Sequence, residues 1–270
     1  MRRFHGVELS DLGWFPSVMR EAGNAYLRFA GELAGHPARI GRIIESALER
    51  SREPEILDLC SGGTGPVLQI ARELAARGLE VPVTLTDLYP SAGGRQLIAQ
   101  SGLANARYEA EALDAAAVPS ECPGLRTILS AFHHFDPDKA RQVLASAVEA
   151  RRSIAIVEVA PRRLVPALMI MGVPLAALLA VPFLRPFRAA WLPLTYIIPV
   201  IPLFMLWDGL VSCMRAYTPD EILALARAAD PNAWFDWTVE EPMMTWPVRG
   251  VSMVGIPRER LDSLPPTSPG

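Results

Sequence analysis

A glycine-rich turn after an acidic residue is the segment of this sequence best suited to hold a ligand. Residues 58–66 read Asp-Leu-Cys-Ser-Gly-Gly-Thr-Gly-Pro. Because glycine lacks a side chain, a ligand can approach the backbone of such a turn, and its free N–H groups favour a carboxylate or a phosphate. The glycine spacing does not match the G-x-G-x-x-G of a dinucleotide site, and the turn lacks the Gly-Lys-Ser/Thr ending of a P-loop. A nucleotide phosphate is therefore the weaker interpretation.

The histidine pair His133-His134 is the second feature that could do chemistry. Histidine is the side chain best suited to accept a proton near neutral pH. Both residues are therefore candidate catalytic bases, and we favour His133. A structural role, in which one histidine caps the helix that follows, is the alternative.

Short apolar strands alternate with helices along the chain and must position these residues. This spacing predicts a parallel, doubly wound sheet, in which the glycine turn follows the first strand, Asp87 the second and the histidines the fourth. We expect strands over residues 55–60, 81–87, 106–111, 125–131, 153–159, 234–239 and 248–256. We expect helices over residues 67–76, 91–100, 137–150 and 218–229.

Four motifs in this order resemble those of class I S-adenosylmethionine-dependent methyltransferases, over about residues 53–160. The glycine turn resembles their motif I, which wraps the methionyl part of S-adenosylmethionine. Asp87 matches the acidic residue that accepts hydrogen bonds from both ribose hydroxyls, and Asp114-Ala115 resembles the motif at the adenine edge, for which Glu111 competes. The run 129–137 resembles the L-H-H-F-x-P motif after strand four.

The resemblance implies an α/β fold with a doubly wound, mostly parallel seven-stranded sheet, and S-adenosylmethionine as cofactor. The cofactor-binding residues that it implies are Asp58, Cys60, Ser61, Gly62, Gly63, Gly65, Asp87, Leu88, Asp114, Ala115, Ser130 and Phe132. Each motif also has a purely structural interpretation: a tight turn for the glycines, a helix cap for Asp87 and a solvated loop for Asp114. Cys60 is interpreted as a packing residue, since no base accompanies it.

We expect five regions: an N-terminal helical cap (1–52), the cofactor-binding core (53–160), a hydrophobic insertion (161–215), the last helix and strands of the core (216–260), and a tail (261–270). The insertion contains uncharged runs at 164–184 and 189–207, separated by four residues that include Arg185 and Arg188. A 21-residue helix would span a bilayer core of about 30 Å, but six prolines interrupt these runs.

Three interpretations of the insertion remain open: a membrane-spanning hairpin, a shallow membrane-docking lid and a buried apolar substrate tunnel. Each implies a lipophilic acceptor or membrane contact. The insertion lies where the ubiquinone and menaquinone biosynthesis methyltransferases, which the chain loosely resembles, build their substrate lid. The candidate acceptor-site residues are Trp14, Phe15, Glu158, Trp207, Asp208 and Tyr217.

The formal net charge of −3 and the absence of a basic stripe argue against a nucleic-acid partner. Three separated cysteines without a C-x-x-C pair predict no metal site and no disulfide framework, and they favour the cytoplasm. We expect no secretory signal at the N-terminus, because no apolar run follows its basic residues. We therefore expect a cytoplasmic methyltransferase, membrane-associated through residues 164–207, that acts on a lipophilic small molecule by O-, C- or N-methylation. The alternatives are a non-catalytic, membrane-associated protein that binds S-adenosylmethionine or a nucleotide, and a decarboxylating user of the same cofactor.

Overall fold

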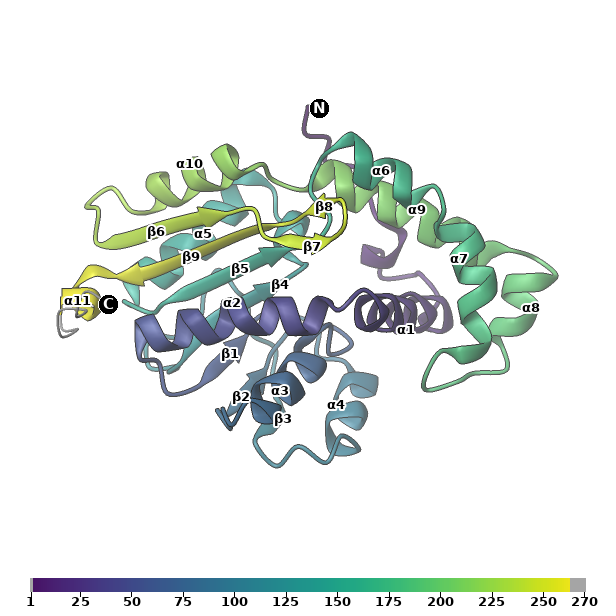
Figure 1. Ribbon diagram of the computed structural model, residues 1–270, viewed down its shortest axis with the longest axis horizontal. Coiled ribbons are helices and arrows are strands. Elements are labelled where there is room, and N and C mark those ends of the chain that lie inside the picture. Colours follow the sequence, from purple (N-terminus) through teal and green to yellow (C-terminus); the bar gives the residue numbers. More distant parts are fainter. Residues whose placement is uncertain (1, 263–270) are drawn as a thin grey trace.

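A seven-stranded sheet forms the centre of the computed structural model, which describes residues 2–262. The strand order is β3-β2-β1-β4-β5-β9-β6, and β9 runs antiparallel to both of its neighbours (Figure 1). The predicted doubly wound, mostly parallel sheet is therefore confirmed. Its strands are β1 (Ile56–Asp58), β2 (Val83–Leu85), β3 (Ala106–Tyr108), β4 (Leu125–Leu129), β5 (Ile154–Glu158), β6 (Phe235–Glu240) and β9 (Val251–Pro257).

Helices cover both faces of this sheet and bury its β-branched and leucine side chains. On one face, α2 (His36–Ser51), α3 (Val67–Ala76) and α4 (Ala92–Ala99) enclose the first hydrophobic core. On the other, α5 (Pro137–Glu149) and α10 (Pro219–Ala229) enclose the second. Helix α2 therefore packs on the sheet itself, although it lies within the predicted N-terminal cap.

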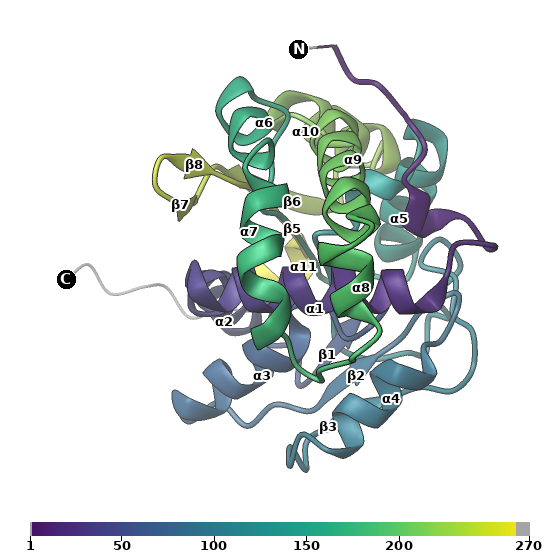
Figure 2. The same cartoon turned by 90° about the vertical axis from the view of Figure 1, so that its right-hand side faces the viewer.

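The insertion folds at one end of the molecule, beside α1 (Ser17–Leu33), into three helices of six to eight residues and one of 16 (Figures 1 and 2). Prolines inside the apolar runs keep the first three helices short, because each removes a backbone hydrogen-bond donor. A third hydrophobic core joins them to α1 and includes Phe15, Trp191 and Phe204. The insertion's elements are α6 (Leu164–Ile170), α7 (Val173–Ala180), η3 (Val181–Phe183), α8 (Trp191–Tyr196) and α9 (Val200–Arg215).

Within residues 2–262, no single helix has both the length and the apolar composition of a membrane span. Two bent helix pairs meet that test together, by length and composition only. One of them is α6 with the segment Val173–Phe183, bent by 43°.

Near the C-terminus the structure contains a hairpin that the sequence analysis did not predict. Strands β7 (Met243–Thr245) and β8 (Val248–Arg249) are too short to give an alternating pattern, and the predicted strand 248–256 is divided between β8 and β9. Helix α11 (Arg258–Asp262) takes the first two residues of the predicted tail. The rest of that tail, from residue 263, lies outside the described residues.

Candidate functional site

The glycine turn joins β1 to α3, at the carboxyl end of the central strand. Gly62 and Gly65 have φ angles of +51° and +46°, which glycine adopts without strain. A Cβ atom on Gly62 would meet no other atom within 4 Å. The turn therefore exposes backbone that a ligand can approach closely.

Asp58 and Ser61 support this turn from beneath. Both side chains are buried, and the Asp58 carboxylate accepts hydrogen bonds from Ser61 Oγ at 2.5 Å and from Thr127 Oγ1 at 2.6 Å. Burial raises the pKa of Asp58 to about 7. Of the predicted cofactor-binding residues, these two therefore shape the turn rather than face a ligand.

Asp87 follows β2 and lies beside the open side of the turn. Its Oδ2 accepts a hydrogen bond from the Gly62 N–H at 2.7 Å, and its Oδ1 accepts one from the Tyr89 N–H at 2.8 Å. Each carboxylate oxygen has a second lone pair, so Asp87 can still accept hydrogen bonds from a ligand. Leu88 is 45% exposed next to it and offers an apolar contact.

Asp114 is ion-paired with Lys139 at 2.7 Å and caps the Ala116 N–H at 2.9 Å. Burial alone would raise the pKa of Asp114, but the hydrogen bonds from Lys139 and Ala116 outweigh it, and the pKa is lowered. Ala115 is buried, whereas Glu111 is exposed. The competition between Glu111 and Asp114 for the adenine edge therefore stays open.

Among the remaining predicted cofactor residues, Ser130 is half-buried at the end of β4, with φ of +53°. Cys60 is half-buried and also has a positive φ, and burial raises the pKa of its thiol, which argues against a nucleophile. Phe132 is fully buried against Phe135 and Tyr217. Its side chain is therefore part of the second hydrophobic core and is not available to a cofactor.

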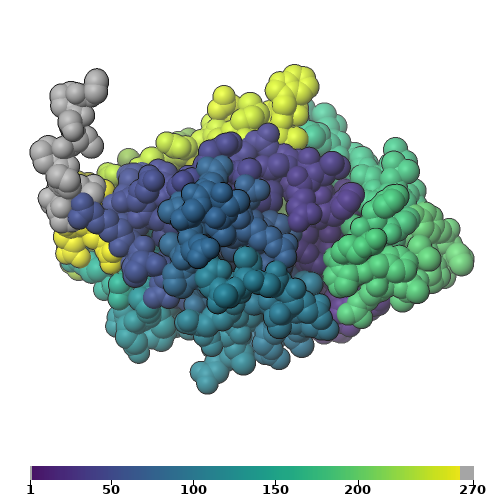
Figure 3. Space-filling model, turned by 60° about the horizontal axis from the view of Figure 1, so that its bottom comes forward, coloured from purple at the N-terminus to yellow at the C-terminus, as the bar shows by residue number. Residues whose placement is uncertain are grey.

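Helix α1 lies against the glycine turn, a contact that the sequence analysis did not predict. Arg28 Nη1 donates a hydrogen bond to the Gly63 carbonyl at 3.1 Å. A Cβ on Gly63 would lie 2.7 Å from Asn24 Nδ2, so only glycine fits there without a shift of Asn24. Figure 3 shows α1, in purple, between the blue elements of the turn and the green insertion. The helix places a cationic side chain beside the turn.

His133 is buried at the carboxyl end of β4 and is held by Glu158 at the end of β5. The Glu158 carboxylate accepts hydrogen bonds from His133 Nδ1 at 2.8 Å and from its main-chain N–H at 3.1 Å. Burial raises the pKa of Glu158, but the charge and hydrogen bonds of His133 outweigh this, and the pKa is lowered. Because a carboxylate only accepts, Nδ1 carries a proton, and in the neutral ring Nε2 then keeps a lone pair. This Nε2 is buried and has no hydrogen-bond partner.

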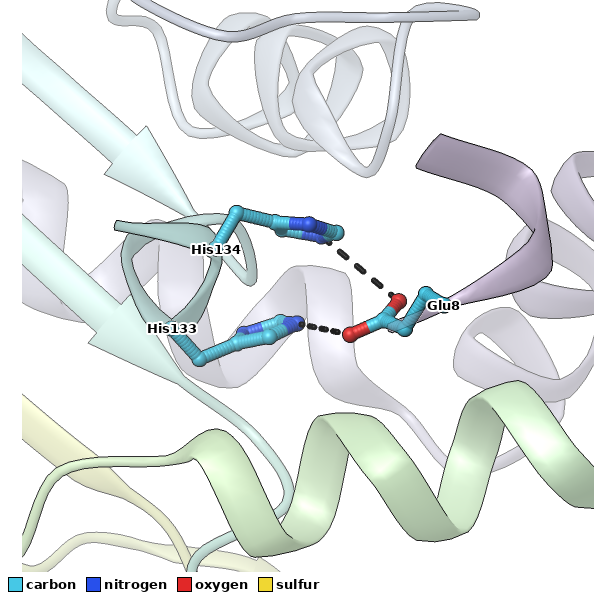
Figure 4. Close-up of side chains that lie close together, drawn as sticks. All are labelled: Glu8, His133 and His134. Atoms are coloured by element: carbon cyan, nitrogen blue, oxygen red, sulfur yellow. Dashed lines mark ion pairs between the residues drawn. The ribbon is translucent and has the colours of Figure 1, made fainter. Parts of the chain in front are cut away.

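His134 points toward the same place, and a buried glutamate from the N-terminal segment meets both rings (Figure 4). Glu8 lies 3.7 Å from His133 Nε2 and 3.8 Å from His134 Nε2. Burial raises the pKa of Glu8 to about 7, although His134 and Arg215 act in the opposite direction. The three side chains converge on one small region.

Asp11 and Arg215 complete this cluster. Asp11 lies 3.0 Å from His134 Nδ1, and Arg215 is ion-paired with Asp11 at 2.8 Å and with Glu8 at 3.2 Å. Burial would raise the pKa of Asp11, but hydrogen bonds from His134 and Arg215 lower it to about 2. Neither Glu8 nor Asp11 was predicted, because nothing near them in sequence marks them as neighbours of the histidines.

The N-terminal segment reaches the histidines because α9 holds it. Asp208 accepts hydrogen bonds from the Leu9 N–H at 2.7 Å and the Ser10 N–H at 2.9 Å, and Trp207 Nε1 donates to the Val7 carbonyl at 3.0 Å. Both residues were predicted to contact an acceptor. In this structure, their polar atoms instead fix the segment that carries Glu8.

The other predicted acceptor-site residues are dispersed. Phe15 is buried against Phe204, and the buried Tyr217 donates its hydroxyl to the Phe135 carbonyl at 2.8 Å. Trp14 is 73% exposed. Only Glu158, which orients His133, lies in the histidine cluster.

Comparisons with solved structures identify the architecture. The plantazolicin methyltransferase BpumL in complex with SAH is similar over 93% of this chain and 94% of its own, with a TM-score of 0.54 and 12% identity. The S-adenosylmethionine-dependent methyltransferase SibL, in its apo form, is similar over 96% of this chain and 63% of its own, with a TM-score of 0.52 and 15% identity. No family model and no curated protein matches the sequence. Likeness at these identities establishes the fold, which is the expected class I methyltransferase fold.

Proposed function

We propose that this protein is an S-adenosylmethionine-dependent methyltransferase that acts on a lipophilic small molecule. The observation that carries the proposal is the open glycine turn with Asp87 hydrogen-bonded to it, at the carboxyl end of the central strands of a class I methyltransferase fold. In such sheets, ligands bind at this edge, where the strand order reverses.

The charges around the turn suit S-adenosylmethionine better than a nucleotide phosphate. Asp87 and Asp114 are acidic, and both would repel a phosphate chain, whereas a vicinal diol and an exocyclic amine are hydrogen-bond donors that carboxylates accept. Arg28 is the cation that contacts the turn, and it can pair with the methionyl carboxylate. The two carboxylates and Arg28 therefore match the ribose, the adenine and the methionyl carboxylate of this cofactor.

Methyl transfer is an in-line displacement in which the methyl carbon bonds to the acceptor while its bond to sulfur breaks. The electron pair of that bond stays on sulfur, and S-adenosylhomocysteine leaves. A hydroxyl acceptor also loses a proton, for which His133 Nε2 offers a lone pair. Glu158 fixes the tautomer and the orientation of the ring that this task needs.

The insertion supports a lipophilic acceptor and contact with a membrane. Large apolar side chains recur at intervals of three and four residues along α6, α7 and η3, and each is more than half exposed: Leu164, Leu168, Met171, Leu175, Leu179 and Phe183. Within each helix, residues at this spacing share one side, and the two helical segments are bent by 43° at the break between them. We call these six exposed residues the apolar stripe. Apolar surface of this extent is characteristic of interaction sites. Because the stripe faces outward, we favour the membrane-docking lid over the buried tunnel.

Calorimetry with S-adenosylhomocysteine tests the proposal. We expect binding to the wild-type protein, whereas NAD and ATP do not bind. Asp87→Ala should weaken binding by about 1.5–3 kcal/mol, as is typical of hydrogen bonds to a charged group. Asp138→Ala, which removes an exposed carboxylate from α5, is the matched control and should bind normally. Full-strength binding by a folded Asp87→Ala variant would remove Asp87 from the site, and no binding by the wild type would overturn the proposal.

A further inference from the structure

Three potential metal ligands converge where the N-terminal segment crosses the carboxyl end of β4. One ligand atom from each of Glu8, His133 and His134 lies within 4.8 Å of the other two. Two histidines and one carboxylate form a common protein ligand set for first-row divalent ions. From this cluster we propose that Glu8, His133 and His134 bind a divalent transition-metal ion of the zinc or cobalt type.

A buried lone pair supports the proposal independently of the clustering. The His133 side chain is only 8% exposed, and its Nε2 has no hydrogen-bond partner. Leaving a buried polar atom unpaired costs about 1–3 kcal/mol, so such atoms in native proteins require an explanation. This Nε2 points toward Glu8 in Figure 4, where a metal ion would satisfy it.

Both histidines are oriented as metal ligands are. A ligating imidazole usually donates its second N–H to a carboxylate, which fixes the tautomer and the ring. Glu158 accepts from Nδ1 of His133 at 2.8 Å, and Asp11 lies 3.0 Å from Nδ1 of His134. The centroids of the two rings lie 4.4 Å apart, and their planes form an angle of 33°. Both Nε2 atoms face Glu8 (Figure 4).

The three side chains must close around an ion to bind it. A tetrahedral ion with bonds of 2.0–2.1 Å needs ligand atoms about 3.3 Å apart. Glu8 Oε1 lies 3.7 Å from His133 Nε2, and Glu8 Oε2 lies 3.8 Å from His134 Nε2. One ligand atom from each residue lies within 4.8 Å of the other two, so the closure is at most about 1.5 Å for any pair. Three protein ligands leave a fourth position for a water or an acceptor atom. Mg²⁺ prefers oxygen ligands and should bind poorly.

The use of this ion in catalysis rests on the proposed function, whereas its binding does not. A hydroxyl bound to a divalent ion would release its proton to solvent more readily, so His133 would then act as a ligand of the ion and not as the base. Metal binding and cofactor binding involve different residues and are measured separately. If the protein does not bind the metal, the proposed cofactor site still stands, and the reverse also holds.

Titration of the metal-free, full-length protein with Zn²⁺ by calorimetry tests the site, with Co²⁺ absorption as a spectroscopic check. We expect one tight equivalent per chain and the visible bands of four- or five-coordinate Co²⁺. His133→Ala, His134→Ala and Glu8→Gln should each weaken Zn²⁺ binding at least tenfold. Asp11→Asn, which changes only the partner of a ligand, should also weaken it about 10–100-fold.

His36→Ala is the matched control, since His36 Nε2 is hydrogen-bonded to Thr245 Oγ1 at 2.8 Å and His36 does not belong to the cluster. Retained binding of S-adenosylhomocysteine shows that a variant has folded. Loss of Zn²⁺ binding in the ligand variants but not in His36→Ala supports the site. Absence of Zn²⁺ binding by the wild type, or equal binding by all variants, would overturn it.

Discussion

His133 illustrates how much a single residue's chemistry depends on partners from elsewhere in the chain. Its Nδ1 is fixed by Glu158 from β5, and its Nε2 faces Glu8 from the N-terminal segment. The sequence predicted that the histidine pair follows the fourth strand, and it lies shortly after β4. The tautomer and the direction of the ring, however, follow from residues that only the fold brings together.

Substitution of His133 should separate chemistry from cofactor binding. We expect His133→Ala to lower turnover roughly 10²–10⁴-fold, as is typical when a proton acceptor is lost, with unchanged affinity for S-adenosylhomocysteine. Glu158→Gln should also lower kcat, because an amide can donate to Nδ1 and stabilise the wrong tautomer. Steady-state kinetics together with calorimetry measures both effects. Parallel loss of turnover and cofactor affinity would indicate a structural role, and unchanged turnover would indicate an acceptor that needs no base.

At the scale of single residues, the glycine turn and Asp87 could be predicted because their local pattern is itself the signal. The glycines at positive φ closely follow β1, and the acid closely follows β2, so the strands that position them are next to them in the sequence. Glu8 could not be predicted in the same way. It meets the histidines because Asp208 on α9 fixes the backbone of the next two residues, and Arg215 reaches the histidine carbonyls from the end of the same helix.

At the scale of elements, α1 performs a task that its amphipathic pattern did not reveal. The pattern predicted a helix in the N-terminal cap, and Ser17–Leu33 is helical. One side of that helix contacts the insertion through the third core, and Arg28 contacts the glycine turn. The same helix therefore links the cofactor side of the site to the apolar end of the molecule.

This contact leads to a prediction for Arg28. If its guanidinium pairs with the methionyl carboxylate, Arg28→Ala should weaken S-adenosylhomocysteine binding about tenfold or more, as expected for a hydrogen bond between charged groups. Binding of methylthioadenosine, which lacks the carboxylate, should not change, whereas Asp87→Ala should weaken both ligands. Arg42→Ala on α2 is the matched control. If Arg28→Ala weakened the binding of both ligands equally, Arg28 would instead have a structural role in maintaining the conformation of the turn.

At the scale of the whole molecule, the sheet and the insertion differ in how far sequence could predict them. The alternation of short apolar runs with amphipathic helices predicted the sheet, although β1, β2 and β3 have only three residues each. The insertion is apolar on all sides, so periodicity could not tell which side faces the protein. The prolines predicted breaks in the helices, but the apolar stripe became evident only once α1 and α9 had covered the opposite side.

The apolar stripe predicts that the protein binds lipid surfaces through this end (Figure 2). We expect the wild type to cosediment with vesicles of neutral phosphatidylcholine, and binding should persist at 0.5 M salt because apolar burial is not screened. Leu175, Leu179 and Phe183 are 64%, 68% and 65% exposed. Full burial of such a side chain contributes about 1.5–3 kcal/mol, so even half of that for three residues exceeds a tenfold effect.

The triple variant Leu175→Ser, Leu179→Ser, Phe183→Ser should therefore lose more than tenfold in vesicle affinity, with S-adenosylhomocysteine binding unchanged. Trp246→Ser and Tyr89→Ser provide the control, because both side chains are 82% exposed but lie outside the insertion. If the control substitutions reduced vesicle binding as much as the triple variant does, binding would reflect general surface hydrophobicity. Vesicle binding by the wild type that disappears in salt would point to the exposed arginines instead. Binding that depends on the stripe alone would place the insertion at the lipid surface, together with α9, whose Asp208 holds the segment that carries Glu8.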